Sequence, residues 1–298
     1  MATLTRAVST LAAVVTAVFL LTAALPQDAA QVLAGRQADP TRLAALRAEL
    51  GLDRPWWSRF FSWLAGLLHG DLGRSYVDGR PVGPVLAERL GASALIVVPA
   101  WLLAVVSGVV VALVVARRAA GSAAVAAFAA LPEVVLVSGL VLVFATGLRL
   151  LPAVSLVPVG GSAWDAPEVL VLPVLGLALP SAAWLARSVR GPVTDVLRRP
   201  FVVDAHLRGV SPVRVVVRHV LPHLAAPVAQ GAAILAGALL AGTTVVESLL
   251  AYPGLGRLLA TAVAGRDVPV VQAVALVDAV VVLGAVLVAD RVAKAGAR

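Results

Sequence analysis

The sequence predicts an all-α, polytopic membrane protein with six transmembrane helices. Hydrophobic residues make up 60% of its 298 residues and charged residues only 13%, whereas soluble domains average about 45–50% apolar and about 25% charged residues. The apolar residues form long uncharged blocks, and a helix needs about 20 such residues to cross a bilayer. The strands of an outer-membrane barrel would instead alternate apolar and polar residues. Helices are therefore expected to span the membrane.

Six apolar blocks are the candidate spans, and charged residues, glycines and prolines separate them. They lie at about 7–25, 93–116, 123–148, 169–188, 226–248 and 269–289. Because six is an even number, both termini are expected on the same side. We expect a single transmembrane domain over residues 1–298, with a first span (1–25), an extracellular segment (26–92) and a five-helix core (93–298).

Basic residues between the spans indicate the orientation, because short cytoplasmic loops are enriched in lysine and arginine. With the N-terminus inside, the inner connections hold Arg6, Arg117, Arg118, Arg187, Arg190, Arg198, Arg199, Arg208, Arg214, Arg218, Arg291, Lys294 and Arg298. The two short outer connections hold Arg149, Arg257 and Arg266. Both termini are thus expected to be cytoplasmic, and the net charge of +8 reflects topology rather than nucleic-acid binding. Residues 1–25 also resemble a secretory signal peptide, and whether they are cleaved stays open.

The extracellular segment is predicted to contain one amphipathic helix. Its apolar residues recur every three or four positions, which places them on one helical face: Trp56, Trp57, Phe60, Phe61, Leu64, Leu67 and Leu68. Aromatic rings favour the membrane interface, so this face either lies there or packs against the spans of the same chain. A glycine-punctuated turn follows at Gly70-Asp71-Leu72-Gly73-Arg74-Ser75.

The connection at about 190–225 is predicted to be a helix–turn–helix on the cytoplasmic surface. Pro200 suits a first helical turn and Gly209 suits a left-handed closing position. Ser211 is expected to cap a second helix that has Pro212 at its first position. On that helix one face would carry the valines at positions 213, 216, 217 and 220. The loop reads either as a docking surface or as a basic loop that only sets topology.

The spacing within this loop resembles that of permease subunits of ATP-binding cassette (ABC) importers, and further motifs resemble the dipeptide, oligopeptide and nickel permease family. The loop carries Ala205, Gly209, His219, Leu221 and Pro222. The further motifs, in chain order, are Pro26-Gln27-Asp28-Ala29, Leu50-Gly51-Leu52-Asp53-Arg54-Pro55, Gly70-Asp71-Leu72-Gly73-Arg74-Ser75, Pro81-Val82, Glu88-Arg89-Leu90, Arg218-His219, Val246-Glu247, Tyr252-Pro253-Gly254-Leu255-Gly256-Arg257, Arg266-Asp267 and Pro269.

This resemblance implies a permease fold of the type I ABC importer kind in a bacterial inner membrane. It implies four protein partners, namely a second homologous permease, two cytoplasmic ATPase subunits that bind ATP and Mg²⁺, and an extracellular solute-binding protein. The residues it would assign to coupling with the ATPase are Phe201, Asp204, Ala205, Arg208, Gly209, Arg218, His219, Leu221 and Pro222. Its extracellular motif corresponds to Gly70, Asp71, Gly73, Ser75, Pro253, Gly254 and Gly256. The chain departs from the family where Phe201 replaces a usual tyrosine and Val286 a usual asparagine.

Three acids fall within the predicted spans or at their ends. Intramembrane acids are costly and usually functional or paired, so Glu133, Glu247 and Asp278 are candidates for a translocation pathway or gate. Glu247 also coincides with the family's Val-Glu pattern. A proton relay in an ion-coupled secondary transporter and pairing with arginines are the alternatives. The small residues Gly237, Ala238, Ala241 and Gly242 would let another helix approach closely. They are expected to face a partner helix, and packing within the chain is the alternative.

Several chemistries are not expected on this chain. It has no cysteine, and it lacks the Gly-x-x-x-x-Gly-Lys-Ser/Thr stretch that cradles nucleotide phosphates. No cofactor or metal is expected on it, because its histidines (His69, His206, His219 and His223) lack a third ligand nearby. We therefore expect a non-enzymatic permease subunit that imports peptides, with nickel chelates as the alternative solute and a non-transporting scaffold as a further hypothesis.

Overall fold

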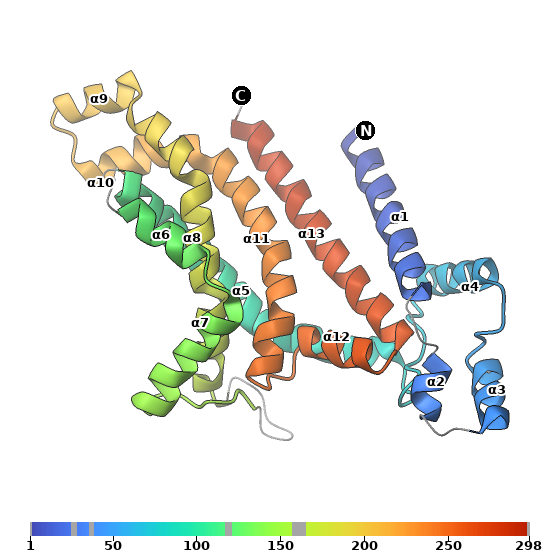
Figure 1. Ribbon diagram of the computed structural model, residues 1–298. Helices are drawn as coiled ribbons and strands as arrows, with labels where there is room; N and C mark the ends of the chain where they lie inside the picture. Colours follow the sequence, from blue (N-terminus) through green and yellow to red (C-terminus); the bar gives the residue numbers. More distant parts are fainter. Residues whose placement is uncertain (1, 25–28, 36–38, 117–120, 157–164, 297–298) are drawn as a thin grey trace. The chain divides into compact units, whose positions relative to one another are not determined.

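The regular secondary structure of the protein is helical in the part that the computed structural model describes, which comprises residues 2–24, 29–35, 39–116, 121–156 and 165–296. In these ranges a single isolated β-bridge pairs Arg74 with Pro81. Figure 1 shows the helices, which are α1 (Ala2–Ala23), α2 (Ala29–Ala34), α3 (Pro40–Glu49), α4 (Trp56–Leu68), α5 (Val82–Ala116), α6 (Gly121–Ala129), α7 (Glu133–Leu140), the π-helix η1 (Val141–Gly147), α8 (Glu168–Leu197), α9 (Pro200–Leu207), α10 (Pro212–Val215), the π-helix η3 (Val216–Val220), α11 (Leu221–Leu249), α12 (Leu255–Ala264) and α13 (Val268–Gly296).

Long apolar helices account for the predicted spans. Four continuous stretches in the described residues are long and apolar enough to cross a membrane, namely α5, α8, the run from α10 to α11, and α13. A fifth candidate is the bent pair formed by α6 with α7 and η1, and α1 contributes the shorter apolar helix Val8–Ala23. Each predicted block falls on one of these helices. The prediction of an all-helical polytopic membrane protein is confirmed. Among the predicted residues, Pro26-Gln27-Asp28, Arg117, Arg118 and Arg298 lie outside the described residues, as does the side chain of Arg6.

The third span is not the continuous helix that the block at 123–148 predicts. Its two halves meet at an angle of 96°. The break coincides with Pro132, whose ψ of 135° is extended and which precedes the first residue of α7. A proline disfavours helical geometry in the residue before it, so the helix stops there. Prolines inside other spans, such as Pro180 in α8 and Pro227 in α11, leave those helices continuous, as membrane helices often allow.

Two compact units make up the chain, and each has its own core. One unit comprises residues up to Ser93 together with Pro253–Val280, and the other comprises Ala94–Tyr252 together with Val281–Arg298. We call them the first and second unit. Helices α5 and α13 each contribute a part to both.

The core of the second unit forms where α8 packs on α11, α6, α7 and α9. Its fully buried residues include Leu185, Val189 and Val193 from α8 and Leu224 and Leu235 from α11. Glycines let these helices approach closely. A Cβ atom at Gly176 of α8, for example, would lie only 2.7 Å from Cγ2 of Val137 in α7.

The core of the first unit joins the start of α5 to α12 and to the start of α13. Its buried residues are Val82, Leu86, Leu255, Ala262, Val270, Ala273 and Val274. Helix α1 is attached through a hydrogen bond in which Nε2 of Gln272 donates to Oγ1 of Thr22 over 2.8 Å. Rings of α4 pack on the same helix, since Phe60 and Trp63 lie 5.1 and 5.6 Å from the ring of Phe19. One side of the predicted amphipathic helix therefore packs against the chain's own apolar helix.

Candidate functional site

The loop between α8 and α11 forms two short helices joined by a left-handed glycine. Helix α9 begins with Pro200 at its first position, as predicted. Gly209 has φ = +74°, also as predicted, and the backbone around it closes the helix with bonds from Gly209 N to His206 O (3.0 Å) and from Val210 N to Ala205 O (3.1 Å). These bonds satisfy carbonyls at the end of α9. A Cβ atom at Gly209 would have no atom within 4 Å, so the glycine is needed for its backbone conformation alone.

The second short helix differs from the prediction in two respects. Ser211 occupies the N-cap position, but its hydroxyl makes no capping hydrogen bond. The predicted valine face is wrong as well, because Val213 and Val217 are exposed whereas Val215 and Val220 are buried. The cause is the π-helix at Val216–Val220. Its i→i+5 bonding lengthens the helical turn, and Val215 and Val220, which are five apart, share the buried face.

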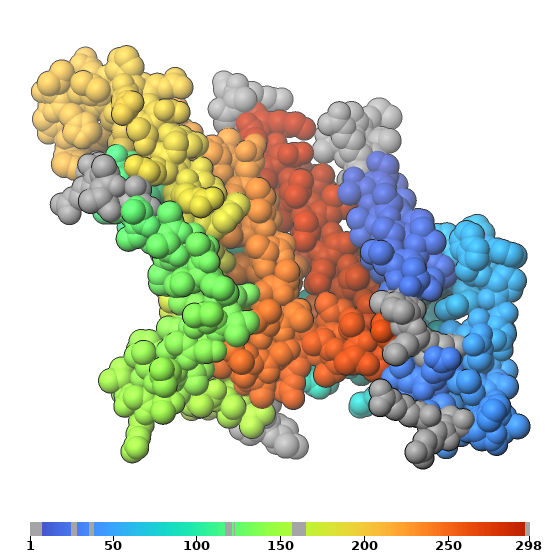
Figure 2. Space-filling model, viewed as in Figure 1, coloured from blue at the N-terminus to red at the C-terminus, as the bar shows by residue number. Residues whose placement is uncertain are grey.

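The outer surface of this loop, which Figure 2 shows in yellow to gold, carries both apolar and basic side chains. We use the term loop surface for its exposed residues, which are Val203, Leu207, Val213 and Val217 with Arg198, Arg199, Arg208, Arg214 and Arg218. Leu207 is 82% exposed and Val213 is 74% exposed. Arg208 forms an ion pair with Asp204 over 2.9 Å. Contiguous exposed apolar residues rimmed by polar groups are typical of protein interaction sites.

The opposite side of the loop is anchored in the core of the second unit. Val202 and Ala205 of α9 are buried in the same cluster as Val189 of α8 and Leu224 of α11. Ala205 thus faces inward and is not part of the loop surface. Phe201 stacks on His223 at a ring distance of 4.8 Å, which ties α9 to the beginning of α11.

Of the other predicted loop residues, His219 lies in η3 with its Nδ1 atom buried and without a hydrogen-bond partner. Nδ1 of His223 donates to the carbonyl oxygen of His219 over 3.0 Å. Leu221 and Pro222 form the first turn of α11, and the side chain of Pro222 is exposed. The loop residues are thus continuous with the span that follows them.

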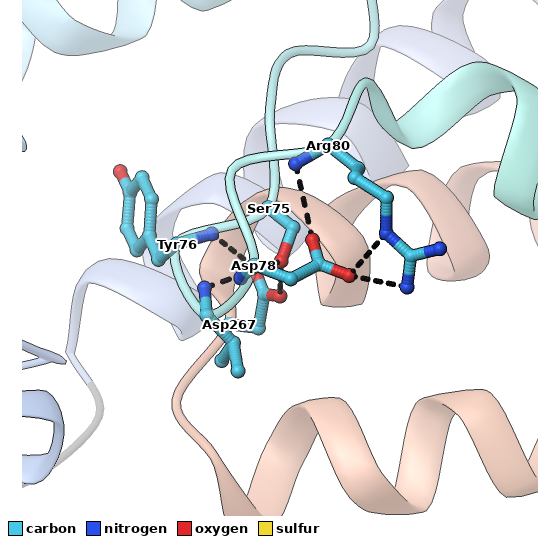
Figure 3. A network of polar contacts seen from close by, with 6 residues as sticks. Ser75, Tyr76, Asp78, Arg80 and Asp267 are labelled. Atoms are coloured by element: carbon cyan, nitrogen blue, oxygen red, sulfur yellow. Dashed lines mark hydrogen bonds and ion pairs between the residues drawn. The ribbon is translucent and has the colours of Figure 1, made fainter.

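In the first unit, the Gly70–Ser75 motif meets the turn between α12 and α13. The hydroxyl of Ser75 donates to Oδ2 of Asp267, and the backbone N–H of Tyr76 donates to Oδ1 of Asp267 over 2.9 Å (Figure 3). Asp267 is only 5% exposed. Because both carboxylate oxygens accept hydrogen bonds, the buried charge is satisfied. We call this group, together with Asp78 and Arg80, the Asp267 network.

The turn itself is closed by local hydrogen bonds. Asp71 Oδ1 accepts from Gly73 N over 2.8 Å, and Gly70 and Gly73 have φ of +78° and +82°. Asp78 and Arg80 form an exposed ion pair of 2.6 Å. The backbone N–H of Arg80 is the main cause that lowers the pKa of Asp78. Burial raises the pKa of the Tyr76 hydroxyl, and the guanidinium of Arg59 opposes this rise.

The second half of the predicted extracellular motif packs on the start of α5. Nη1 of Arg89 donates to the carbonyl of Pro253 over 2.9 Å, and the N–H of Leu255 donates to Oγ of Ser93 over 2.6 Å. Gly254 and Gly256 are buried beside them. The prediction of site residues did not include Ser93, Arg89, Tyr76 or Asp267. For Asp267, the Arg266-Asp267 motif was the only signal in the sequence.

The three candidate pathway acids have different surroundings. Glu247 is 0% exposed at the end of α11, and Tyr252 N donates to its carbonyl oxygen over 2.9 Å. Burial, reinforced by the charge of Glu247, raises the pKa of Tyr252 to about 12. Glu133 begins α7 and faces α11, since a Cβ atom at Gly242 would lie 2.7 Å from its Oε1. Asp278 belongs to the first unit, and its Oδ1 is buried without a hydrogen-bond partner.

Of the four small residues of α11 that were predicted to face a partner, two pack within the chain and two are exposed. Gly242 faces Glu133, and a Cβ atom at Gly237 would lie 3.1 Å from Cγ2 of Val282 within the same unit. The expectation that these two glycines face a partner is therefore wrong. Ala238 and Ala241 are exposed. Within the described residues, no three His, Cys, Asp or Glu side chains are grouped so that they could hold a metal ion.

Comparison with known proteins assigns the chain to a family. A sequence model described as "Binding-protein-dependent transport system inner membrane component" matches residues 104–298, and one described as its N-terminal region matches residues 2–96. The glutathione transport system permease protein GsiC of Escherichia coli (strain K12) is 34% identical over 263 residues, which cover 86% of this chain and 83% of the relative. A putative peptide transport system permease protein of Brucella abortus (strain 2308) is 34% identical over 260 residues, covering 85% and 83%.

These matches extend over both units and confirm the resemblance to the dipeptide and oligopeptide permeases. ATP in such systems binds to separate ATPase subunits. The chain therefore belongs to the inner-membrane components of binding-protein-dependent transport systems, as a multi-pass permease subunit of an ABC importer that is not itself an enzyme.

Proposed function

We propose that this chain forms half of a peptide translocation pathway and couples it to two cytoplasmic ATPase subunits through the loop surface. A second homologous permease would supply the other half, and a solute-binding protein would deliver the peptide. Both termini would be cytoplasmic. The observation that carries the proposal is the loop surface, where exposed apolar and basic side chains lie on a loop whose inner side is buried among the spans.

The exposed apolar residues favour a protein partner. Leu207 and Val213 are more than 70% exposed although they stand in a loop rich in arginine. Removing apolar side chains from water stabilises an interface by about 25 cal/mol per Å². The surrounding arginines would add orientation and a faster encounter with an acidic partner. A groove in an ATPase subunit fits this combination.

Packing on the inner side supports transmission of movement. Val202 and Ala205 of α9 and Val215 and Val220 of the following helix share one cluster with α8 and the start of α11. Packed cores are not continuously deformable. A displacement of α9 would therefore carry α8 and α11 with it, which would change access to the pathway as the ATPase pair closes and opens.

The permease pathway would include the acids that adjoin α11. Glu133 faces Gly242, and Glu247 is buried at the end of the same helix. Asp278 stays a candidate because its buried oxygen has no hydrogen-bond partner. Peptides are the proposed solute because the names of the relatives refer to glutathione and to peptides.

The coupling role can be tested with Leu207→Glu in the assembled complex. A charge placed in an apolar contact is costly, so we expect association with the ATPase subunits to weaken by about tenfold or more and ATP-driven peptide uptake to fall. Ser211→Ala is the matched control, since this nearby hydroxyl makes no capping bond. Normal uptake by Leu207→Glu would reject the proposed contact.

The orientation can be tested separately, because the natural chain contains no cysteine. Leu207→Cys should react with a membrane-impermeant maleimide only in inside-out vesicles, and Val77→Cys only in intact cells or right-side-out vesicles. Both positions are more than half exposed. Labelling of position 207 from outside the cell would overturn the topology.

A further inference from the structure

Helix α4 carries two apolar strips, and the packing of the first unit uses only one of them. The inner strip includes Phe60 and Trp63, whose rings contact Phe19 of α1. The second strip consists of Trp57, Phe61, Leu64 and Leu68, which follow one another at helical spacing. Phe61 is 64% exposed and Leu68 is 80% exposed. A 13-residue helix that leaves this much apolar surface in water would lose the stabilisation that burial provides.

The position of α4 relative to α1 indicates what covers the second strip. Phe19 lies four residues before the end of α1, an apolar helix that is the first predicted span. Figure 1 shows α4 running across this end of α1. A helix held across the end of a span lies at the boundary between hydrocarbon and water.

The chemistry of α4 matches that boundary. Tryptophan and other aromatic rings are enriched where the hydrocarbon core meets the headgroups, and interfacial helices bury an apolar face about 5–10 Å deep. The polar side of α4 is small, with Ser58 and Ser62. The guanidinium of Arg59 interacts electrostatically with the hydroxyl of Tyr76 in the adjacent turn. The helix is thus oriented by Phe19 and Tyr76, and its second strip lies beside the inner strip, where the ring of Phe61 is 5.5 Å from that of Phe60.

From this geometry we infer that α4 is a membrane-surface anchor whose second strip is immersed in the outer leaflet of the bilayer. The anchor holds the segment between α1 and α5 at a set depth, and through Arg59 it reaches the turn of the Asp267 network. The inference concerns lipid and is independent of which solute the importer carries.

The test uses the natural absence of cysteine to place one spin label at a time on the full chain in nanodiscs. Phe61→Cys lies on the second strip, and Ser62→Cys is the matched control, exposed and one residue away but turned by about 100°. At position 61 we expect collisions with oxygen, which partitions into lipid, to exceed those with a water-soluble nickel chelate. At position 62 we expect the ratio to reverse.

The other outcomes overturn the inference. Ready access of the nickel chelate to position 61 would mean that the strip faces water. Protection of position 61 from both reagents would mean that a protein surface covers it instead. Loss of the excess of oxygen collisions at position 61 when the solute-binding protein is added would likewise mean that a protein surface, and not lipid, covers the strip. Since each label occupies an exposed position, loss of folding does not confound the comparison.

Discussion

The loop surface of the second unit and the Asp267 network of the first unit differ in whether their side chains find partners within the chain. In the network, the buried carboxylate of Asp267 accepts hydrogen bonds from Ser75 and Tyr76, so its charge is compensated within the chain. On the loop surface, Leu207 and Val213 stay in water. The difference indicates that the network maintains the fold of its own unit, whereas the loop surface leaves apolar side chains open to the ATPase contact that we propose.

Replacement of Gly209 by valine should have the largest effect on this contrast. A left-handed backbone costs a residue with a Cβ about 1–2 kcal/mol, and more when it is β-branched. The space around Gly209 is open, so the strain falls on the turn between α9 and α10 and shifts the loop surface. We expect ATP-driven uptake to be lost while membrane insertion is retained, measured by transport in proteoliposomes and by the yield in the membrane fraction.

Gly209→Asn provides the control for this substitution, because asparagine tolerates the left-handed conformation better than valine. It should retain most of the uptake. Equal loss in both variants would show that a side chain at this position clashes with the partner, and that backbone conformation is not the cause.

Replacement of Asp267 by alanine should have an intermediate effect that is confined to the first unit. It leaves the hydroxyl of Ser75 and the N–H of Tyr76 without their acceptor, and hydrogen bonds to a charged group contribute about 1.5–3 kcal/mol each. We expect faster tryptic cleavage at Arg74 and a lower melting temperature, with binding to the ATPase unchanged. Weakened ATPase binding would contradict the separation of roles.

Asp78→Asn is the matched control for Asp267→Ala, since its ion pair with Arg80 is exposed and is worth at most about 1 kcal/mol. The sign of its pH dependence follows from the lowered pKa of Asp78. The small stabilisation that the Asp78 carboxylate gives the fold is present above the usual carboxyl pKa, and it disappears as the pH falls through the lowered pKa. At neutral pH, Asp78→Asn removes only this small contribution, so it should accelerate tryptic cleavage far less than Asp267→Ala does.

The two tyrosines give the smallest but most direct comparison. The chain has only Tyr76 and Tyr252, and burial raises the pKa of both, that of Tyr252 to about 12. Tyr252 should therefore not ionise near pH 10, and Tyr76 should ionise above the usual tyrosine pKa, as followed by absorbance at 295 nm. A raised folded pKa stabilises the fold below the unfolded pKa, and this contribution is lost as the pH rises towards 12. Glu247→Gln should lower the pKa of Tyr252 only partly, because burial is the larger cause; a full return to the usual value would reverse that order.

Composition and periodicity were sufficient to predict the helical spans, because apolar blocks of about 20 residues have few alternatives in a membrane protein. Local rules also predicted the start of α9 at Pro200 and the left-handed Gly209. The valine face was wrong because a π-helix changes the period of the helix, and no pattern in the sequence marks that change. Pro132 breaks its span whereas Pro180 does not. The residue that precedes each proline does not predict this difference.

Candidate site residues were harder to place, because their partners are distant in sequence. Ser75 and Asp267 are 192 positions apart, and no local spacing relates them. Ala205 was recognised as a motif residue, but only packing shows that it faces the core. Burial of Val215 and exposure of Leu207 likewise depend on how α9 and α10 rest on α8 and α11.

The break at Pro132 has a consequence for how the protein places an acid within an apolar span. Because α7 begins anew at Glu133, the first amide groups of this helix have no helical carbonyl to bind. The partial positive charge of a helix N-terminus favours an acidic residue in the first turn, and Glu133 occupies that turn of α7. The break therefore places this acid at a helix start, from which its carboxylate reaches Gly242 of α11.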